Sequence, residues 1–120
     1  MIKFSKICEN GQPVDLGVTP LTTDLVYLTE NYKQVGSLLL VYEDQNASVF
    51  SLEVLTPYRK KGYGRRLMEK AIKRCEEKGC SILTLNTEID NDAANNLYQS
   101  MGFEFDGIKS GFNSYKKSIH

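Results

Sequence analysis

The sequence predicts one α/β domain over residues 1–120, with a mixed sheet of the α+β kind and helices packed against it. The length of 120 residues suits a single hydrophobic core. The first half of the chain alternates short β-prone segments with turn-forming residues, whereas the second half changes to a helical period. The resulting order of strands, helix, strand, helix and strands is typical of a mixed sheet.

The first half is expected to form a meander of antiparallel strands. Residues 2–18 read as two short strands around a turn at 10–13, followed by a strand at 25–28 and a turn at 30–33. The dense apolar run at 35–42 is too short to be assigned to a helix with certainty and is flanked by turn formers. A turn at 44–46 then leads into a strand at 47–55, which is rich in β-branched and aromatic residues.

The second half begins with an amphipathic helix from Gly62 to about Gly79. Its apolar side is formed by Tyr63, Leu67, Met68, Ala71, Ile72 and Cys75. A strand at 81–87 follows, with Ile82, Thr84 and Asn86 on one side. A second helix starts at the capping residues 90–91 and ends near Gly102, and two closing strands at 103–105 and 113–115 suggest a hairpin.

The composition limits where the protein is expected to reside and what it is expected to contact. Hydrophobic residues make up 41% and charged residues 25% of the chain, which is ordinary for a globular protein. No apolar run reaches about 18 residues, and the N-terminus lacks the apolar core of a signal peptide. Three cysteines without CxxC spacing indicate reduced thiols. We therefore expect a cytoplasmic protein without membrane contact, and a homodimer stays open.

Charge and histidine content exclude further classes. The formal net charge is zero, so no overall field attracts nucleic acid, and we expect no such partner. The single histidine is His120. This removes triads that contain histidine and most metal sites that contain histidine. A metal site would need carboxylates or cysteines alone, and since no spacing suggests one, no metal is expected.

The most informative stretch is the turn at 55–67, between a predicted strand and a predicted helix. Gly62 and Gly64 allow a ligand to approach the backbone, and the first turn of a helix leaves N–H groups unpaired. These donors and the helix dipole form an anion site. Five basic residues add positive charge within eight positions: Arg59, Lys60, Lys61, Arg65 and Arg66.

Two better-known phosphate-binding motifs do not fit this turn. A P-loop requires Gly-Lys-Ser/Thr, but Arg65 follows Gly64 here. The dinucleotide fingerprint requires a third glycine where Leu67 stands. A solvated loop without a ligand and a small nucleic-acid patch remain alternatives.

Two segments resemble the GNAT superfamily of N-acetyltransferases. Residues 59–64 (RKKGYG) match its Arg/Gln-x-x-Gly-x-Gly/Ala turn, and residues 55–57 (LTP) resemble the strand end before it. Residues 91–103 (NDAANNLYQSMGF) are similar to its Asn-x-x-Ala-x-x-Leu-Tyr-x-x-x-Gly-Phe helix. The two motifs occur in the family's order, and the likeness covers about residues 25–115. The resemblance implies a GNAT acyl-CoA N-acyltransferase fold.

The same resemblance implies that acetyl-CoA is the co-substrate. Its pyrophosphate would lie on the backbone of the glycine turn, its pantetheine arm beside the strand end, and its acetyl carbonyl on the N–H of Val54 or Leu55. Asn91 would touch the pantetheine arm, or act only as a helix cap. The implied cofactor-binding residues are Val54, Leu55, Thr56, Arg59, Lys60, Lys61, Gly62, Tyr63, Gly64, Arg65, Asn91 and Tyr98.

The implied activity is direct transfer of the acetyl group to a primary amine in a ternary complex. Tyr98 would face the cofactor sulfur, unless it only packs in the core. Asn86 occupies a position where some relatives carry a glutamate that acts as the general base, and an amide cannot accept a proton. Glu53, Glu88 and Asp90 remain, and Glu53, which precedes the expected oxyanion amide, is the candidate base or substrate contact. Residues 13–24 are too few to supply the family's N-terminal helices, so these are expected to be reduced or missing. The alternative is a non-catalytic module that binds acyl-CoA.

Overall fold

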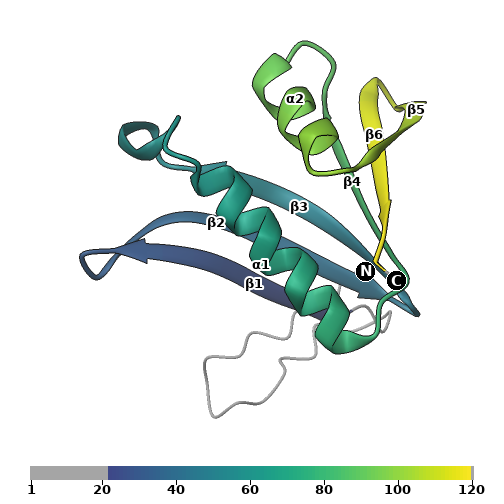
Figure 1. Cartoon of the computed structure of the whole chain (residues 1–120), viewed down its shortest axis with the longest axis horizontal. Helices are drawn as coiled ribbons and strands as arrows, with labels where there is room; N and C mark the ends of the chain where they lie inside the picture. Colours follow the sequence, from purple (N-terminus) through teal and green to yellow (C-terminus); the bar gives the residue numbers. More distant parts are fainter. Residues whose placement is uncertain (1–21, 120) are drawn as a thin grey trace.

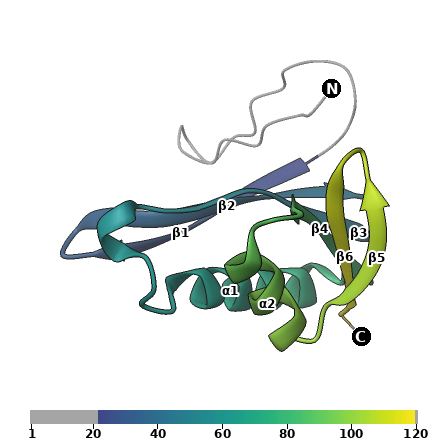
Figure 2. The same ribbon diagram turned by 90° about the horizontal axis from the view of Figure 1, so that it is seen from above.

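The computed structural model describes residues 22–119, in which two α-helices cover one face of a six-stranded sheet (Figures 1 and 2). The strand order is β1-β2-β3-β4-β6-β5. The elements are β1 (Thr22–Glu30), β2 (Lys33–Glu43), β3 (Asn46–Val54), the 3₁₀ turn η1 (Thr56–Tyr58), α1 (Tyr63–Lys78), β4 (Ile82–Glu88), α2 (Asp92–Ser100), β5 (Glu104–Lys109) and β6 (Phe112–Ser118). The mixed sheet predicted from the sequence is confirmed. The expected strands and turn within residues 2–18, and most of the segment at 13–24, lie outside the described residues.

The meander β1-β2-β3 forms because tight turns join strands of matching pattern. Asn31 and Tyr32 both have positive φ, 52° and 66°, and they form the two-residue loop between β1 and β2. This geometry fits the right-handed twist of a hairpin. The ambiguous apolar run is the central strand β2, in which Val35, Leu38 and Leu40 are fully buried. Leu38 and Leu40 belong to the hydrophobic core, while the half-buried Leu39 between them lies on the other face of the sheet. Apolar residues on both faces make the pattern nearly continuous rather than alternating.

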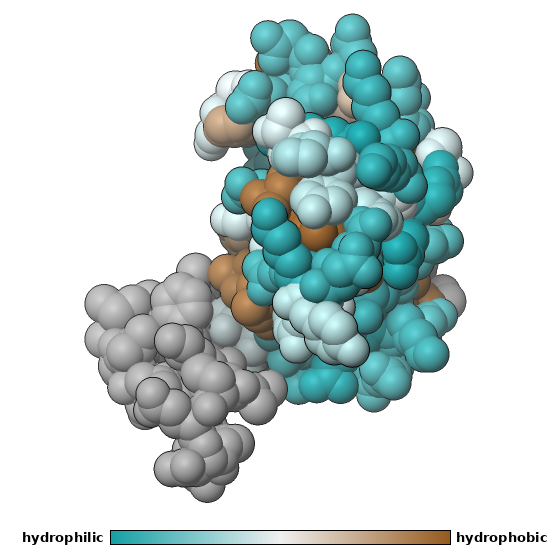
Figure 3. All heavy atoms as spheres, turned by 90° about the vertical axis from the view of Figure 1, so that its left-hand side faces the viewer, coloured by the Kyte–Doolittle hydropathy of each residue, from teal (hydrophilic) through white to brown (hydrophobic). Residues whose placement is uncertain are grey.

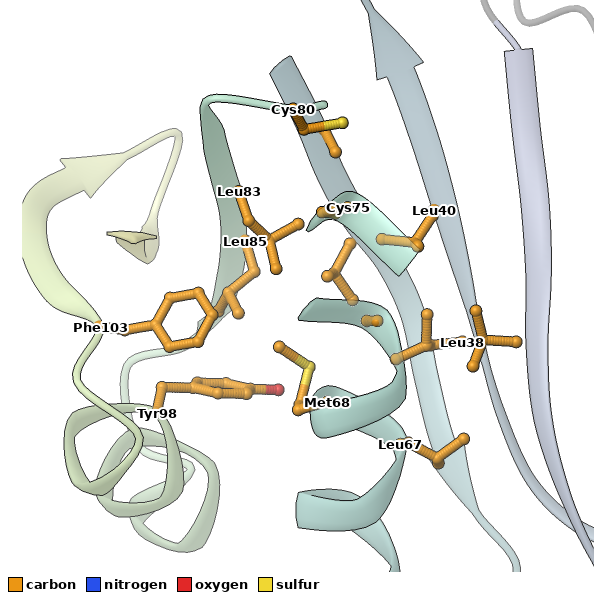
Figure 4. Packing of buried hydrophobic residues seen from close by; sticks show 14 of the residues in the cluster. Leu38, Leu40, Leu67, Met68, Cys75, Cys80, Leu83, Leu85, Tyr98 and Phe103 are labelled. Carbon is orange, nitrogen blue, oxygen red and sulfur yellow. The ribbon is translucent and has the colours of Figure 1, made fainter. Parts of the chain in front are cut away.

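Helix α1 covers β1, β2 and β3 with its apolar side. Leu67, Met68, Ala71 and Cys75 are fully buried against the sheet, at the spacing that the helical period predicts. Gly79 ends the helix at φ 74°, and its N–H donates to the carbonyls of Cys75 and Glu76. Figure 4 shows Leu67 and Met68 meeting side chains from β2, β4 and α2 in one core. Replacing a buried leucine here by alanine would cost about 2–5 kcal/mol.

Strands β3 and β4 are parallel and separate after a short paired stretch. Residues 46–49 pair with residues 82–85, and no pairing continues beyond Val49. Just past that point, the register between β2 and β3 shifts and Ser51 has φ 55°, which marks a β-bulge. A bulge bends its strand and increases the local twist. The two strands consequently diverge, and Figure 1 shows the gap opening between β3 and β4.

The remaining elements close the sheet on the far side of this gap. After β4, α2 returns the chain to the hairpin of β5 and β6, and β6 pairs along the whole of β4. The expected hairpin is confirmed, although Phe103 precedes β5 and belongs to the core. Leu83, Leu85 and Thr87 face the core, so the predicted alternation of β4, with Ile82, Thr84 and Asn86 on the other face, is also confirmed.

Candidate functional site

A cleft of about 610 Å³ lies where β3 and β4 separate. Its walls are the end of β3, the glycine turn, the first turn of α1 and the start of α2. The lining residues are Leu52, Glu53, Val54, Tyr58, Arg59, Lys60, Gly62, Tyr63, Gly64, Arg65, Asn91, Ala93, Ala94 and Leu97. The fold thus brings the two motifs of the sequence, 59–64 and 91–103, to opposite sides of one cleft.

The glycine turn leaves the start of α1 open. Lys60 and Gly62 have left-handed backbones, with φ of 63° and 82°, and turn the chain into the helix. The first intrahelical hydrogen bond runs from the N–H of Arg66 to the carbonyl of Gly62, at 3.1 Å. No side chain caps this helix, and its first turn contains no acidic residue. Its first N–H groups and its dipole are therefore available to an anion.

Most of the predicted basic residues lie near the open start of α1, but their side chains make different contacts. Arg59 donates its Nε–H to the carbonyl of Val54 at 2.9 Å, and Arg65 donates to Ser100 Oγ at 2.6 Å. Lys60 lines the cleft and is exposed. Lys61 and Arg66 do not line it; they stack on the rings of Tyr58 and Tyr63, at 5.6 and 5.4 Å. Figure 3 faces the end of the molecule with the glycine turn and shows a mainly hydrophilic surface interrupted by hydrophobic patches.

The end of β3 offers one backbone amide to the cleft. The N–H of Leu55 donates to the carbonyl of Val35 at 2.9 Å, so this amide is occupied by β2. Successive residues of a strand point their amides to opposite sides, and the N–H of Val54 therefore points toward the gap. Of the two amides considered for the acetyl carbonyl, Val54 is the available one. Thr56 belongs to η1, and neither Leu55 nor Thr56 lines the cleft.

Helix α2 begins with a side-chain cap. Asn91 Oδ1 accepts a hydrogen bond from the N–H of Ala94 at 3.2 Å, which gives Asn91 the capping role, and Asn91 also lines the cleft. Asn95, which the sequence analysis did not single out, is 8% exposed and fixes the loop before α2. Its Nδ2 donates to the carbonyls of Glu88, Ile89 and Asn91, while its Oδ1 accepts from Asn113 and Tyr115. A polar residue three positions before Tyr98, on the buried face of a helix, was the available signal.

Tyr98 lies in the core beneath the cleft and not in its lining. Its ring packs against Phe103 and Tyr115, with centroids 6.0 and 5.9 Å away. In Figure 4 its hydroxyl points toward Met68 on α1. Burial raises the pKa of Tyr98 to about 12. The phenol is therefore neutral near pH 7 and can act as a hydrogen-bond donor.

The candidate base Glu53, on β3, and Asn86, on β4, are both exposed and lie outside the hydrophobic core. Glu53 is exposed and lines the cleft, between Leu52 and Val54, which pack toward the core. Asn86 lines a smaller hollow of about 160 Å³ together with residues of β3 that include Phe50. An amide cannot accept a proton from an ammonium group, so Asn86 offers no base there.

The structure also bears on metals and membranes. Within residues 22–119, no three or more side chains of the metal-binding types gather at one place. Neither helix in this part of the chain has the length and apolarity needed to cross a bilayer. The cleft thus presents backbone donors and basic side chains, and the neutral phenol of Tyr98 lies in the core beneath it.

Several residues that line the cleft were not predicted from the sequence, because the fold brings them together. Leu52, Tyr58, Ala93, Ala94 and Leu97 line the cleft beside the predicted residues. Leu52 alternates with Val54 on β3, so the strand period could have indicated it. Ala94 and Leu97 stand at the Ala and Leu positions of the second motif, and a Cβ at Gly64 would lie 3.5 Å from Leu97 Cδ2, so the structure adds that these residues face the start of α1.

Solved structures place this fold among N-acetyltransferases. The PaiA N-acetyltransferase of Thermoplasma acidophilum, solved with coenzyme A, superposes with a TM-score of 0.76, covering 80% of this chain and 60% of that one at 19% identity. The ribosomal-protein-S18-alanine N-acetyltransferase of Escherichia coli gives a TM-score of 0.68 at 26% identity, over 78% of this chain and 70% of that chain. The predicted fold class is confirmed.

The family follows from the sequence comparison. The acetyltransferase (GNAT) family matches residues 18–103, and the chain belongs to this family. The [ribosomal protein bS18]-alanine N-acetyltransferase of Escherichia coli K12 is 32% identical over 85 residues, which cover 71% of this chain and 57% of that protein. N-alpha-acetyltransferase 30 of Saccharomyces cerevisiae is 42% identical over 52 residues, 43% of this chain and 30% of that protein. The chain therefore spans only part of the length of these relatives.

Proposed function

We propose that this chain binds acetyl-CoA in the cleft between the end of β3 and the starts of α1 and α2, and that it transfers the acetyl group to a primary amine. The observation that carries the proposal is the start of α1, which has no cap and no acid and opens into a cleft lined by Lys60 and Arg65. The pyrophosphate fits this anion site, where backbone N–H groups and the helix dipole act together. Family membership supports the same ligand.

The pantetheine arm is proposed to run along the free edge of β3. Beyond Val49 this edge has no pairing with β4, so an extended arm with amide groups can take the place of the missing strand. The acetyl carbonyl then meets the N–H of Val54, which polarises the carbonyl and stabilises the developing oxyanion. The carbonyl of Val54 is bonded to Arg59, so Arg59 also fixes this part of the strand.

The chemistry is a direct attack within a ternary complex. The amine nitrogen forms a bond to the acetyl carbon, the bond from carbon to sulfur breaks, and coenzyme A leaves as a thiolate. Glu53 takes the proton that the amine must lose, directly or through water, and Tyr98 donates a hydrogen bond toward the sulfur. With a pKa near 12 for Tyr98 and about 8.5 for a thiol, full proton transfer would be uphill by about 5 kcal/mol, so donation without transfer is the consistent role.

A peptide α-amine is the acceptor that suits this site best. Deprotonating a lysine-type amine at pH 7 costs about 4–5 kcal/mol, whereas an α-amine near pKa 7.8 costs only about 1 kcal/mol. The exposed Glu53 and the amide at Asn86 provide no strongly activated base. The two relatives described above are named for an alanine of a ribosomal protein and for N-alpha acetylation. The free thiols Cys75 and Cys80 further support a cytoplasmic setting.

The test is a thiol-release assay with purified protein, acetyl-CoA and a panel of acceptors. The panel contains peptides with free α-amines, the same peptides blocked at the α-amine but carrying lysine, polyamines and aminoglycosides. We expect turnover with the free peptides and an acetylated N-terminus by mass spectrometry. Thermal stabilisation by acetyl-CoA without turnover of any acceptor would favour the non-catalytic acyl-CoA-binding module. A folded protein that acetyl-CoA does not stabilise would contradict the proposal.

The role of Glu53 has its own test. Glu53→Gln keeps the size of the side chain but removes its ability to accept a proton. We expect kcat/KM at pH 7 to fall about 10–100-fold and the loss to shrink as pH rises toward the pKa of the amine. Glu43→Gln, an exposed change on β2 outside the cleft lining, is the control. A loss that does not change with pH would remove Glu53 from the role of base.

A further inference from the structure

The glycine turn and the first turn of α1 hold a conformation that several local preferences oppose. Lys60 has a left-handed backbone, with φ of 63°, which is unfavourable for a residue that carries a side chain. Gly64 is the second residue of α1, and glycine loses more conformational freedom in a helix than other residues do. Arg65 and Arg66 lie near the positive end of the helix dipole, and no side chain caps this start. The conformation therefore depends on contacts with other parts of the fold.

One such contact comes from the end of β1. Tyr63, the first residue of α1, donates its hydroxyl to Glu30 Oε2 at 2.6 Å. This length is typical of a hydrogen bond from a hydroxyl to a carboxylate. The two residues are 33 positions apart, so the bond joins segments that are distant in the chain. The same bond raises the pKa of Tyr63 above its usual value, so the phenol stays protonated and remains a donor.

Glu30 reaches Tyr63 because of its position on β1. Val26 and Leu28 belong to the core that α1 covers, and Glu30 is the next residue on the same side of the strand. Figures 1 and 2 show the turn between β1 and β2 at the same end of the molecule as the segment between β3 and α1. A half-buried carboxylate on this side of the sheet requires a hydrogen-bond partner, and Tyr63 is one.

Cation–π contacts join the same two segments a second time. Lys33, the first residue of β2, and Lys61 of the glycine turn both lie over the ring of Tyr58, with Nζ 6.0 and 5.6 Å from its centroid. The rings of Tyr58 and Tyr63 are 6.4 Å apart. Contacts of this kind allow a range of distances, whereas a hydrogen bond has a defined length and direction. The bond to Glu30 is therefore the contact that fixes the residue at which α1 begins.

We propose that Glu30 is a positioning residue for the cofactor: through Tyr63 it holds the open start of α1 in the conformation that binds the phosphates. This inference rests on the function proposed above. The unpaired N–H groups of the first helical turn, that of Tyr63 among them, are the donors for the pyrophosphate. Glu30 does not line the cleft, whereas Tyr63 does, so Glu30 acts through Tyr63. Affinity rises when a site is ordered before its ligand arrives, because binding then costs less conformational entropy.

The first test removes either partner of the bond. Glu30→Ala removes the acceptor and Tyr63→Phe removes the donor. We expect each change to weaken acetyl-CoA binding about tenfold in isothermal titration, and the double variant to lose no more than either single one, since all three lack the same bond. For Glu30→Ala, kcat at saturating acetyl-CoA should stay within about twofold while KM for acetyl-CoA rises. Glu43→Ala, at the exposed end of β2, is the matched control and should change neither constant by more than about twofold.

The second test separates the hydrogen bond from the charge of Glu30. Glu30→Gln keeps an oxygen acceptor at the same length but removes the negative charge, and it should retain affinity within about threefold of wild type. A negative charge near an anion site opposes the binding of phosphates. If charge alone mattered, both Glu30→Ala and Glu30→Gln would therefore bind acetyl-CoA more tightly than wild type. Weaker binding in Glu30→Ala with retention in Glu30→Gln is the result that the positioning role requires.

The third test needs no ligand. The N–H of Arg66, bonded to the carbonyl of Gly62 at 3.1 Å, reports fraying of the helix start through its hydrogen exchange. We expect this N–H to exchange at least about fivefold faster in Glu30→Ala than in wild type. The N–H of Ala71, a fully buried residue further along α1, should change less than about twofold. Equal acceleration at both positions would mean that Glu30 stabilises the fold as a whole and has no special role at the helix start.

Failure of this inference differs from failure of the proposed function. Folded wild-type protein that does not bind acetyl-CoA would overturn both. Wild-type protein that binds acetyl-CoA, together with a Glu30→Ala variant that binds it equally well or more tightly, would overturn the positioning role alone. Equal losses of affinity in Glu30→Ala and Glu30→Gln, with exchange of the Arg66 N–H unchanged, would also overturn it.

Discussion

The two helices that line the cleft begin in opposite ways. Helix α1 starts at Gly62 with no side-chain cap, no acidic residue in its first turn, and Arg65 close to its positive end. Helix α2 starts at Asn91, whose side chain caps the N–H of Ala94, and Asp92 lies in its first turn. Both starts line the same cleft, so the difference is not a matter of solvent exposure.

This contrast supports the proposal that the start of α1, and not that of α2, binds the phosphates of the ligand. A side-chain cap is worth about 1 kcal/mol, and an acid in the first turn adds about 0.3–1 kcal/mol. Helix α1 forgoes both, and the arginine it carries there is unfavourable next to the dipole. An anionic ligand would supply the missing negative charge and the missing acceptors. A helix start beside a cleft that lacks its own cap therefore indicates a binding site for an anion, whereas a capped start indicates a segment that only lines the cleft.

The largest expected effect comes from filling the open start. A Cβ at Gly64 would contact only Leu97 Cδ2, at the ordinary distance of 3.5 Å, so Gly64→Val should fold. The added methyl groups would occupy the space of the phosphates and remove two or more charge-assisted hydrogen bonds. We expect acetyl-CoA affinity to fall about 1000-fold. Acetyl-CoA at 100 times its Kd should stabilise the wild-type protein by about 2.7 kcal/mol, measured as a melting shift, and should not stabilise the variant.

The control for this experiment is Lys78→Ala, in the last turn of the same helix. It should keep the full melting shift. If Gly64→Val also kept the shift while remaining folded, the open start of α1 would not be the phosphate site.

The next effect belongs to the α2 side of the cleft. Tyr98→Phe keeps the ring and its contacts with Phe103 and Tyr115 but removes the hydroxyl. We expect kcat to fall about 100-fold, with acetyl-CoA affinity within a few-fold, because the bond to the departing thiolate matters mainly in the transition state. Tyr32→Phe, at the exposed hairpin tip, is the matched control. Equal single-turnover rates for Tyr98→Phe and wild type would assign Tyr98 to packing alone.

A smaller effect should distinguish binding of the phosphates at the charged start of α1 from binding of the pantetheine arm along the neutral edge of β3. Raising the ionic strength from about 0.05 to about 0.5 M shortens the screening length severalfold. We expect acetyl-CoA to bind about tenfold more weakly, and acetylpantetheine, which lacks the phosphates, to change less than about twofold. Isothermal titration of both ligands measures this difference. An equal response would mean that Lys60 and Arg65 form only a solvated surface.

The smallest effect tests the capped start. Asn91→Ala removes the acceptor for the N–H of Ala94 and should cost about 1 kcal/mol of unfolding free energy, a shift of about 4 °C in the melting midpoint. Asn91→Asp preserves the acceptor and should keep most of that stability. Acetyl-CoA affinity should change less than about fivefold in Asn91→Ala. A larger loss of affinity at unchanged stability would instead make Asn91 a contact of the pantetheine arm.

Much of the cleft could be predicted because its signals are local. The glycine turn at 59–64 carries its left-handed positions, its cations and its helix start within a few residues. Site assignments that depend on neighbouring strands or side chains could be predicted less completely. Leu55 and Val54 look equivalent in the sequence, and only the pairing of Leu55 with Val35 distinguishes their amides. Lys61 and Arg66 belong to the same basic run as Lys60, yet their stacking on Tyr58 and Tyr63 takes them out of the cleft lining.

By itself the sequence determined most element types and the two family motifs, and it predicts the anion-binding character of the turn at Gly62, because periodicity, backbone preference and charge are properties of short segments. The tertiary structure alone decided where these segments meet. The bulge at Ser51 and the loss of pairing after Val49 separate β3 from β4, and that separation creates the cleft. The same holds for the buried hydrogen bonds of Asn95. Each depends on contacts between residues far apart in the chain, whose free energy no short segment contains.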